Sequence, residues 1–229
     1  MKKKTLLQML AVVIAVISVP AIALAASNSN FTQTINTGTL TTDIMDASRV
    51  SVASPAVAMS AKAFSFNCYA GGTASTGTFG TNTERMYVSN GDAADNGWTL
   101  TIGATGGATS TWANGGSTQR FDFNDSTGST AGCTDGADAD SFAGQMTINP
   151  AAGSVTTDCA SCTSTGVSLG SSAGFVQGTT DSVTLVNAGS TSNDVWRGYL
   201  TGATVSQTIP AEQAADSYTL NLTLTATAQ

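Results

Sequence analysis

The sequence predicts an all-β protein: a β-sandwich of jelly-roll or immunoglobulin-like (Ig-like) type, folded as a single domain after an N-terminal signal peptide. Many short runs alternate apolar and polar residues, which is the pattern of a strand with one buried face. Charged residues make up 10% of the chain, where about a quarter is usual. Because Glu and Lys are strong helix formers and are scarce here, little helix is expected.

The first 25 residues have the organisation of a secretory signal peptide. Three lysines at positions 2–4 precede an apolar run over positions 6–22, and the small-x-small triplet Ala23-Leu24-Ala25 ends the segment. An uncleaved membrane anchor is the alternative, but a run of roughly 17 apolar residues is at the short limit for a bilayer span. We therefore expect residues 26–229 to be exported as one domain, secreted or held at the cell surface, with no integral membrane span.

The alternating patterns place the strands in order along the chain, separated by Gly, Asn, Asp and Pro turns. The predicted strands cover residues 31–35, 50–57, 63–69, 85–88, 98–102, 119–123, 145–148, 175–176, 183–186, 196–200, 205–209 and 218–227. Three stretches rich in Ser, Thr and Gly, at 71–83, 103–118 and 161–174, are expected to be long loops. A short turn is expected at 211–215, after Pro210. Loops of this length on an exported sandwich are where binding sites are placed.

Four cysteines in an exported chain predict two disulfides, for which three pairings exist. We expect Cys159 to pair with Cys162, closing a tight loop, and Cys68 to pair with Cys133. A Cys-x-x-Cys sequence can also form a redox pair or half of a zinc site. No βαβ pattern surrounds this one and the chain contains no histidine, so structural disulfides are favoured.

The absence of histidine also bears on catalysis, because it removes the commonest general base and the usual hydrolase triad. Glu84 and Glu212 are the only glutamates, and neither has a recognisable acid/base context for glycoside hydrolysis. A catalytic pair of aspartates within residues 122–140 is the enzymatic alternative. We expect a noncatalytic protein.

The predicted exported chain is strongly acidic. Loss of the three lysines at positions 2–4 leaves five cationic residues against 15 acidic ones, a formal charge of 5 − 15 = −10. The five are Arg49, Lys62, Arg85, Arg120 and Arg197. Nucleic-acid binding requires clustered Arg and Lys to neutralise phosphates, so no nucleic-acid partner is expected.

An acidic segment is the strongest candidate for site chemistry. Its candidate ligands, in a stretch that also has glycines at 128, 132 and 136, are Asp122, Asn124, Asp125, Asp135, Asp138 and Asp140. Calcium takes six to eight oxygen ligands in a flexible loop, and dense carboxylates repel one another unless a cation lies among them. The spacing is not that of an EF-hand. A calcium site is expected, and the alternative is a solvated acidic loop that keeps the surface soluble.

Two parts of the sequence resemble the WxL domain of bacterial cell-surface proteins. Trp98-Thr99-Leu100 matches the first Trp-x-Leu copy, and Leu222-Thr223-Leu224 stands where the second copy would be, with Leu222 in place of the tryptophan. The resemblance implies a secreted, β-rich domain held noncovalently at the cell wall through peptidoglycan, or through another cell-wall polymer, with Trp98, Leu100, Leu222 and Leu224 as the binding motif. The alternative is that these residues are core or edge residues of a sandwich.

Two further functions remain open. The alternating segments 31–35 and 218–227 could pair with the edge of a neighbouring subunit, which would build a filament or surface layer by terminal strand exchange. A carbohydrate-binding adhesin would instead place Trp112 or Tyr69 beside the acidic segment. The chain has no Leu-Pro-x-Thr-Gly sorting signal, so we expect retention at the surface to be noncovalent.

Overall fold

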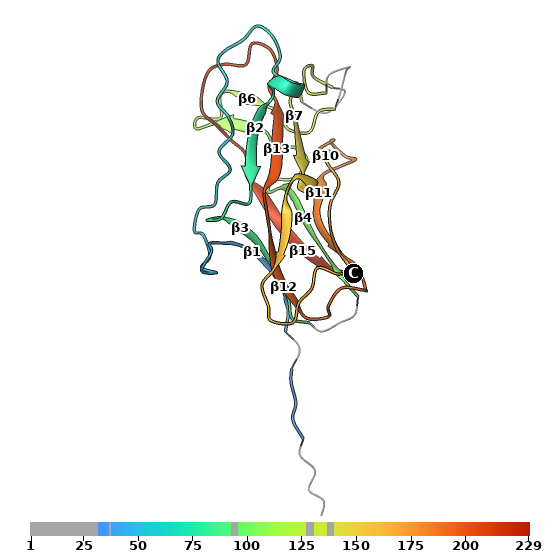
Figure 1. The fold of residues 1–229 in the computed structure, drawn as a ribbon. Helices are drawn as coiled ribbons and strands as arrows, with labels where there is room; N and C mark the ends of the chain where they lie inside the picture. Colours follow the sequence, from blue (N-terminus) through green and yellow to red (C-terminus); the bar gives the residue numbers. More distant parts are fainter. Residues whose placement is uncertain (1–31, 37, 93–95, 127–130, 137–139) are drawn as a thin grey trace, which may run out of the picture. The chain divides into compact units, whose positions relative to one another are not determined.

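A computed structural model describes residues 32–36, 38–92, 96–126, 131–136 and 140–229 (Figure 1). The chain divides into two units, Met1–Asn36 and Thr37–Gln229. The predicted signal peptide lies outside the described residues. Among the described residues, no helix has the length and apolar character needed to cross a membrane.

The described part of Thr37–Gln229 is built from strands, which confirms the all-β prediction. Its strands form four antiparallel sheets, and short 3-10 turns η1 (Gly71–Thr73) and η2 (Pro150–Ala152) interrupt them. Sheet 1 has the order β1 (Leu40–Met45), β3 (Arg85–Asn90), β12 (Trp196–Thr201), β8 (Ser154–Thr157). Sheet 2 has the order β10 (Ala173–Gly174), β7 (Gln145–Asn149), β13 (Ala203–Thr208), β2 (Ser75–Phe79). Sheet 3 has the order β15 (Leu222–Ala228), β4 (Trp98–Ala104), β11 (Ser182–Ala188), β9 (Val167–Leu169), and sheet 4 the order β14 (Tyr218–Thr219), β5 (Trp112–Asn114), β6 (Arg120–Phe121).

Sheets 1 and 2 are two halves of one bent layer. The connections β2–β3, β7–β8 and β12–β13 each carry the chain from one half to the other, and the corresponding strands lie in the same order. Three glycines meet at this bend. Gly202, at φ 80°, donates its N–H to the carbonyl of Gly80, at φ 79°, and a side chain on Gly153 would collide with the carbonyl of Thr201. Glycine is required here because φ is positive and the backbones approach closely.

Sheet 3 covers the bent layer and closes the core. Trp98 of β4 packs on Trp196 of β12 with ring centroids 5.0 Å apart, and both side chains are buried. The same cluster extends from Leu100 and Ile102 of sheet 3 to Ile148 of sheet 2. Strand β11 has a register shift between Thr184 and Val186, so the consecutive side chains Leu185 and Val186 are both buried. One core therefore unites the three large sheets.

The predicted strands at 85–88, 98–102, 145–148, 183–186, 196–200 and 205–209 are confirmed within a few residues, and 119–123 is confirmed as the shorter β6. The short turn expected after Pro210 is present at Ala211 and Glu212. The strand expected at 175–176 is displaced to β10, and the one expected at 218–227 breaks at Leu220 and Asn221 into β14 and β15, which belong to different sheets.

The strand predictions at 31–35, 50–57 and 63–69 were wrong. Residue 31 lies outside the described part, residues 32–35 form no strand, and Ile35 is 87% exposed. Beyond a single bridge at Ser51, residues 50–57 form no strand either, and Pro55 interrupts their alternation. Residues 63–69 pair only through a bridge between Tyr69 and Ile209. Alternation indicates that a segment can pair, but a strand forms only where a neighbour supplies the partner backbone groups.

Five strands were missed. They are β1, β2, β5, β8 and β9, of which β2, β5 and β9 lie in the stretches 71–83, 103–118 and 161–174 expected to be loops. The sequence of β2, Ser-Thr-Gly-Thr-Phe, has a single large apolar residue. It is held by pairing with β13 and by the burial of Phe79, which is 8% exposed. Tertiary context therefore overrides a weak local pattern.

Candidate binding pocket

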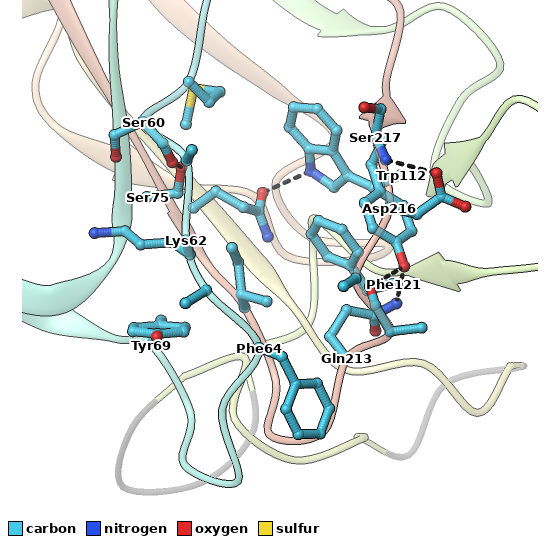
Figure 2. A pocket seen from close by; sticks show the side chains of 18 of the residues that line it. Ser60, Lys62, Phe64, Tyr69, Ser75, Trp112, Phe121, Gln213, Asp216 and Ser217 are labelled. Atoms are coloured by element: carbon cyan, nitrogen blue, oxygen red, sulfur yellow. Dashed lines mark hydrogen bonds between the residues drawn. The ribbon is translucent and has the colours of Figure 1, made fainter.

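A cavity of about 490 Å³ lies beside sheet 4, and we call it the aromatic pocket. Its volume is in the range of small-molecule sites. The lining comes from residues 57–65, from Tyr69, Ser75, Trp112, Phe121, Gln207, Ile209 and Pro210, and from residues 213–218. Figure 2 shows Lys62 and Tyr69 across the cavity from Gln213 and Asp216.

The segment 57–65 forms one wall because it is fixed to the outer edge of β2. Ser60 donates its N–H to the carbonyl of Thr76 at 2.7 Å, and its hydroxyl oxygen accepts the N–H of Thr76 at 2.9 Å. The hydroxyl of Ser75 donates to the carbonyl of Ser60 at 2.7 Å. These bonds occupy backbone groups that an edge strand otherwise leaves open, so an irregular segment becomes a defined wall.

The same wall carries a cation and two aromatic rings. The ammonium of Lys62 lies 5.6 Å from the ring centroid of Tyr69, a cation–π distance. Phe64 lines the pocket and is 49% exposed, and it packs edge-on against Phe66, which is 75% exposed and outside the lining. Two exposed rings in contact form a small apolar patch, and contiguous apolar patches mark interaction sites. Phe64 is therefore available to pack on a ligand.

Three aromatic side chains of sheet 4 form the inner wall. Trp112 of β5 stacks on Phe121 of β6 at 5.7 Å and 9°, and Tyr218 of β14 meets Phe121 edge-on at 5.0 Å. The indole N–H of Trp112 donates to Oε1 of Gln207 at 2.8 Å. Gln207, 2% exposed, donates in turn to the carbonyls of Asp122 and Thr208. A buried amide with its bonds made holds the indole in one orientation.

The opposite wall is polar. Asn114 donates to Oδ2 of Asp216 at 2.7 Å, and the N–H of Ser217 donates to Oδ1 at 2.8 Å. These hydrogen bonds, from the Asn114 side chain first and then from the Ser217 backbone, hold the pKa of Asp216 below its ordinary value. Gln213 donates to the hydroxyl of Tyr218, which donates to the carbonyl of Ala214. The pocket therefore combines aromatic surface with fixed polar groups.

Both predicted disulfides are present. The Cys68–Cys133 bond joins residues 65 positions apart, with a Cα–Cα distance of 5.6 Å, and ties Tyr69 to the acidic segment. The Cys159–Cys162 bond spans 3 positions, with a Cα–Cα distance of 5.4 Å. The adhesin hypothesis placed Trp112 or Tyr69 beside the acidic segment. Both residues line this pocket, and the first disulfide and the bond from Gln207 to Asp122 connect it to that segment.

The six residues predicted as calcium ligands are placed differently from one another. Asp122, Asn124 and Asp125 are buried, at 1%, 1% and 4% exposure. Asp135 is exposed, Asp138 lies outside the described residues, and Asp140 accepts the N–H of Phe142.

Within the part of the chain that the structure describes, no group of three or more His, Cys, Asp or Glu residues is arranged to hold a metal ion. The buried oxygens Oδ1 of Asn124 and Oε1 of Gln177 have no hydrogen-bond partner among the described groups. Amide oxygens of this kind suit calcium. Calcium binding stays a prediction.

The residues that carry the WxL resemblance lie in two adjacent strands. Trp98 and Leu100 belong to β4, Leu222 and Leu224 belong to β15, and Leu224 pairs with Ile102. Trp98 and Leu100 have no exposed surface, so in this structure they pack the core and a wall polymer cannot reach them. The leucines of β15 are half-buried.

Several pocket residues were missed by the sequence reasoning: Lys62, Phe64, Phe121, Gln207, Gln213 and Asp216. The available signal was the scarcity of lysine, because Lys62 is the only one after position 4. Nothing in the local pattern distinguishes Gln207 from the other polar residues of its strand, because its role depends on β5, almost a hundred positions earlier in the chain.

Comparison of the chain with protein-family models found no matching family. Comparisons with curated proteins and with solved structures found no match either.

Proposed function

We propose that the protein is an exported, noncatalytic component of a bacterial cell surface that binds a glycan of the cell wall in the aromatic pocket. The observation that carries the proposal is the combination of the exposed ring of Phe64 with a fixed Trp112 and polar side chains across one cavity. A sugar ring has an apolar face of C–H groups and a rim of hydroxyls. It therefore fits a site with aromatic surface and convergent polar groups.

Peptidoglycan, or another wall polymer with neutral sugar units, is the proposed partner. An uncharged chain is favoured because the predicted exported protein carries a formal charge of −10 from 5 cationic and 15 acidic residues, which repels acidic polymers. The predicted signal peptide and the two disulfides support export to an oxidising compartment. The WxL resemblance supports the same partner, but it implies binding through the strands that carry Trp98, Leu100, Leu222 and Leu224. The burial of Trp98 and Leu100 favours the pocket as the binding site.

A noncatalytic role is part of the proposal. The chain contains no histidine, and Asp216, the acidic residue of the pocket lining, has both carboxylate oxygens in hydrogen bonds and a lowered pKa. A general acid requires a raised pKa instead. Asp216 is therefore suited to accept hydrogen bonds from sugar hydroxyls.

The test is binding of the full chain, exported by a bacterial host and purified after its natural processing, to insoluble peptidoglycan and to a glycan array. We expect saturable binding to at least one wall glycan. Phe64→Ala should weaken it about tenfold, a change of about 1.4 kcal/mol, because an aromatic contact of this size is lost. The matched control is Val195→Ala, which removes an apolar side chain that is 57% exposed and does not line the pocket.

Equal binding by wild type, Phe64→Ala and Val195→Ala would show that the polymer adheres elsewhere. Absence of binding to any wall fraction or arrayed glycan would reject the proposed function. Mass spectrometry of the same preparation identifies the N-terminal residue and so tests the predicted cleavage after Ala25.

A further inference from the structure

A second cavity, of about 560 Å³, opens between strands β1 and β15, and we call it the edge groove. Ile44 of β1 lines one side, and Leu222 and Leu224 of β15 line the other. Its floor includes Ile102 and Met146, core side chains that are each 2% exposed. β1 pairs with β3 and β15 pairs with β4. The two strands belong to different sheets and contact each other without pairing, and the groove lies where they diverge. Asp43 and Glu84 also line the groove, beside these apolar side chains. A groove with apolar side chains next to a strand edge can accept another strand.

The backbone of β15 offers regularly spaced groups along this groove. At one end of the β4–β15 pairing, the N–H of Thr105 donates to the backbone carbonyl of Asn221. At the other end, the N–H of Gln229 donates to the backbone carbonyl of Gly97. Directly opposed residues in an antiparallel pair alternate between bonded and non-bonded pairs. The odd-numbered residues of β15 therefore bond to β4, and the N–H and C=O groups of Leu222, Leu224 and Ala226 point away from it.

The sequence of β15 contains none of the residues that usually protect a strand edge. Its seven residues, Leu-Thr-Leu-Thr-Ala-Thr-Ala, include no charge, no proline and no bulge in the pairing with β4. The edges of β2 and β1 are blunted. Ser60 occupies the backbone of β2 at Thr76, and Val52 donates to Ile44 at the end of β1. A long, uncharged edge is a template for pairing with another chain.

Residues 32–36 are a segment of this chain that could pair as the added strand. These residues belong to the unit Met1–Asn36, separate from the unit that holds the groove. They form no strand, and Ile35 is the most exposed of the large apolar side chains in the described part, at 87%. Thr32, Thr34 and Asn36 alternate with Gln33 and Ile35. Paired as a strand, the segment would present one polar face and one face with Ile35.

We propose that residues 32–36 of a second copy of this chain add to the free edge of β15, with Ile35 packed in the edge groove. Backbone hydrogen bonds provide the affinity and the groove provides the specificity. Each copy offers one segment and one groove, so the contact is head-to-tail and generates open filaments or closed rings. This inference does not depend on the proposed glycan, although Trp112 and Tyr218 line both cavities.

The test is the size of the exported, purified full chain, measured by light scattering as its concentration is raised. Wild type should form oligomers that grow with concentration. Ile35→Lys should be monomeric at the same concentrations, because a charged ammonium replaces the apolar side chain that packs on Leu222 and Leu224. Thr34→Lys is the matched control, with the same charge on the opposite face, and should oligomerise like wild type. A synthetic peptide of residues 31–36 should shorten wild-type oligomers.

A second variant tests the acceptor edge. Ala226→Pro removes an N–H that points away from β4, so the pairing within the sheet keeps its bonds while an added strand loses one. It should assemble less than wild type, and near-ultraviolet circular dichroism checks that it is folded. The Ile35→Lys protein keeps the free edge of β15 unchanged. It should therefore still bind the peptide of residues 31–36.

Three outcomes would overturn the inference. Wild type could remain monomeric up to its solubility limit. Ile35→Lys and Thr34→Lys could oligomerise to the same extent. Hydrogen exchange could show that β15 amides in a monomer lose protection when Ile35 becomes lysine, in which case the chain's own segment fills its own groove. Assembly lost in Ile35→Lys and retained in Thr34→Lys supports the inference.

Discussion

The aromatic pocket and the edge groove are similar in volume and share Val57, Met59, Trp112 and Tyr218 in their linings, yet they suit different partners. The pocket is lined by exposed or fixed aromatic rings and by polar side chains whose hydrogen bonds are made inside the protein. The groove has more aliphatic side chains, together with Asp43 and Glu84, and it lies next to backbone groups of a strand edge. Polar side chains in a cavity can bind a small polar ligand. Unpaired backbone N–H and C=O groups at a strand edge can bind another polypeptide strand. Cavity size alone therefore does not indicate function.

Removal of the Cys68–Cys133 disulfide should produce the largest difference between glycan binding in the aromatic pocket and self-association through the edge groove. The bond closes a loop of 65 residues, and its loss should lower the free energy of unfolding by roughly 2–4 kcal/mol. The double variant Cys68→Ser, Cys133→Ser should lose glycan binding, because Tyr69 is no longer tied to the acidic segment, and should retain self-association. Thermal unfolding with both binding assays measures this. The control is Cys159→Ser with Cys162→Ser, whose 3-residue separation predicts a smaller loss. Loss of self-association to the same extent as glycan binding in the Cys68→Ser, Cys133→Ser variant would contradict this expectation.

Calcium should act on the pocket side of the molecule. If Asp122, Asn124 and Asp125 take part in a calcium site, saturation at about 100 times the dissociation constant should stabilise the protein by about 2.7 kcal/mol. Titration calorimetry and melting curves, with calcium and then with a chelator, measure the effect, and Asp125→Asn should reduce it. An absence of both heat and melting shift would reject the calcium prediction.

Gln207 should affect the pocket more than the groove. Gln207→Leu removes the acceptor of the Trp112 indole and the donor to Asp122. The unsatisfied buried groups should cost roughly 1–3 kcal/mol of stability. Glycan binding should weaken because the indole is no longer oriented. Ile35-dependent assembly should weaken less, because the backbone of β15 provides its hydrogen bonds, although Trp112 lines both cavities. Gln213→Leu, on the half-buried wall, is the milder comparison. A loss of assembly equal to the loss of glycan binding would show that the two sites are coupled.

The smallest effect expected is that of acid on Asp216. Its pKa is lowered in the folded protein by Asn114 and by the Ser217 N–H, so the unfolded chain binds the proton more tightly. The stabilisation is complete above the ordinary aspartate pKa of about 4 and is lost as the pH falls through the lowered value. Asp216→Asn should therefore flatten the acid limb of the stability curve slightly. An unchanged limb would mean that solvent screens the interaction.

The sequence predicted the parts of this molecule whose pattern is local. Alternation in Trp98-Thr99-Leu100-Thr101-Ile102 produced β4 in its correct place, because every second side chain enters the core. The same rule failed for residues 50–57, because a strand also requires a partner edge. Cysteine spacing led to both disulfides, since a Cys-x-x-Cys pair leaves one partner for each remaining cysteine.

The pocket was predictable only in part. Trp112 and Tyr69 were found because large aromatic residues in polar stretches are conspicuous. Gln207 and Asp216 gain their roles from Trp112 and Asn114, about 95 and 102 positions away, and no single-sequence pattern contains that pairing. The edge groove depends on β1, which was missed, and on the break between β14 and β15, which only the different sheet partners explain.

We propose that one β scaffold carries two binding sites, one for a glycan and one for a strand of a second copy. The most direct measurement is glycan binding and oligomer size on the same preparations of Phe64→Ala and Ile35→Lys. The account predicts that Phe64→Ala assembles like wild type and binds glycan about tenfold more weakly, while Ile35→Lys binds glycan like wild type and stays monomeric. If each variant loses both properties, or neither, the two-site account is contradicted.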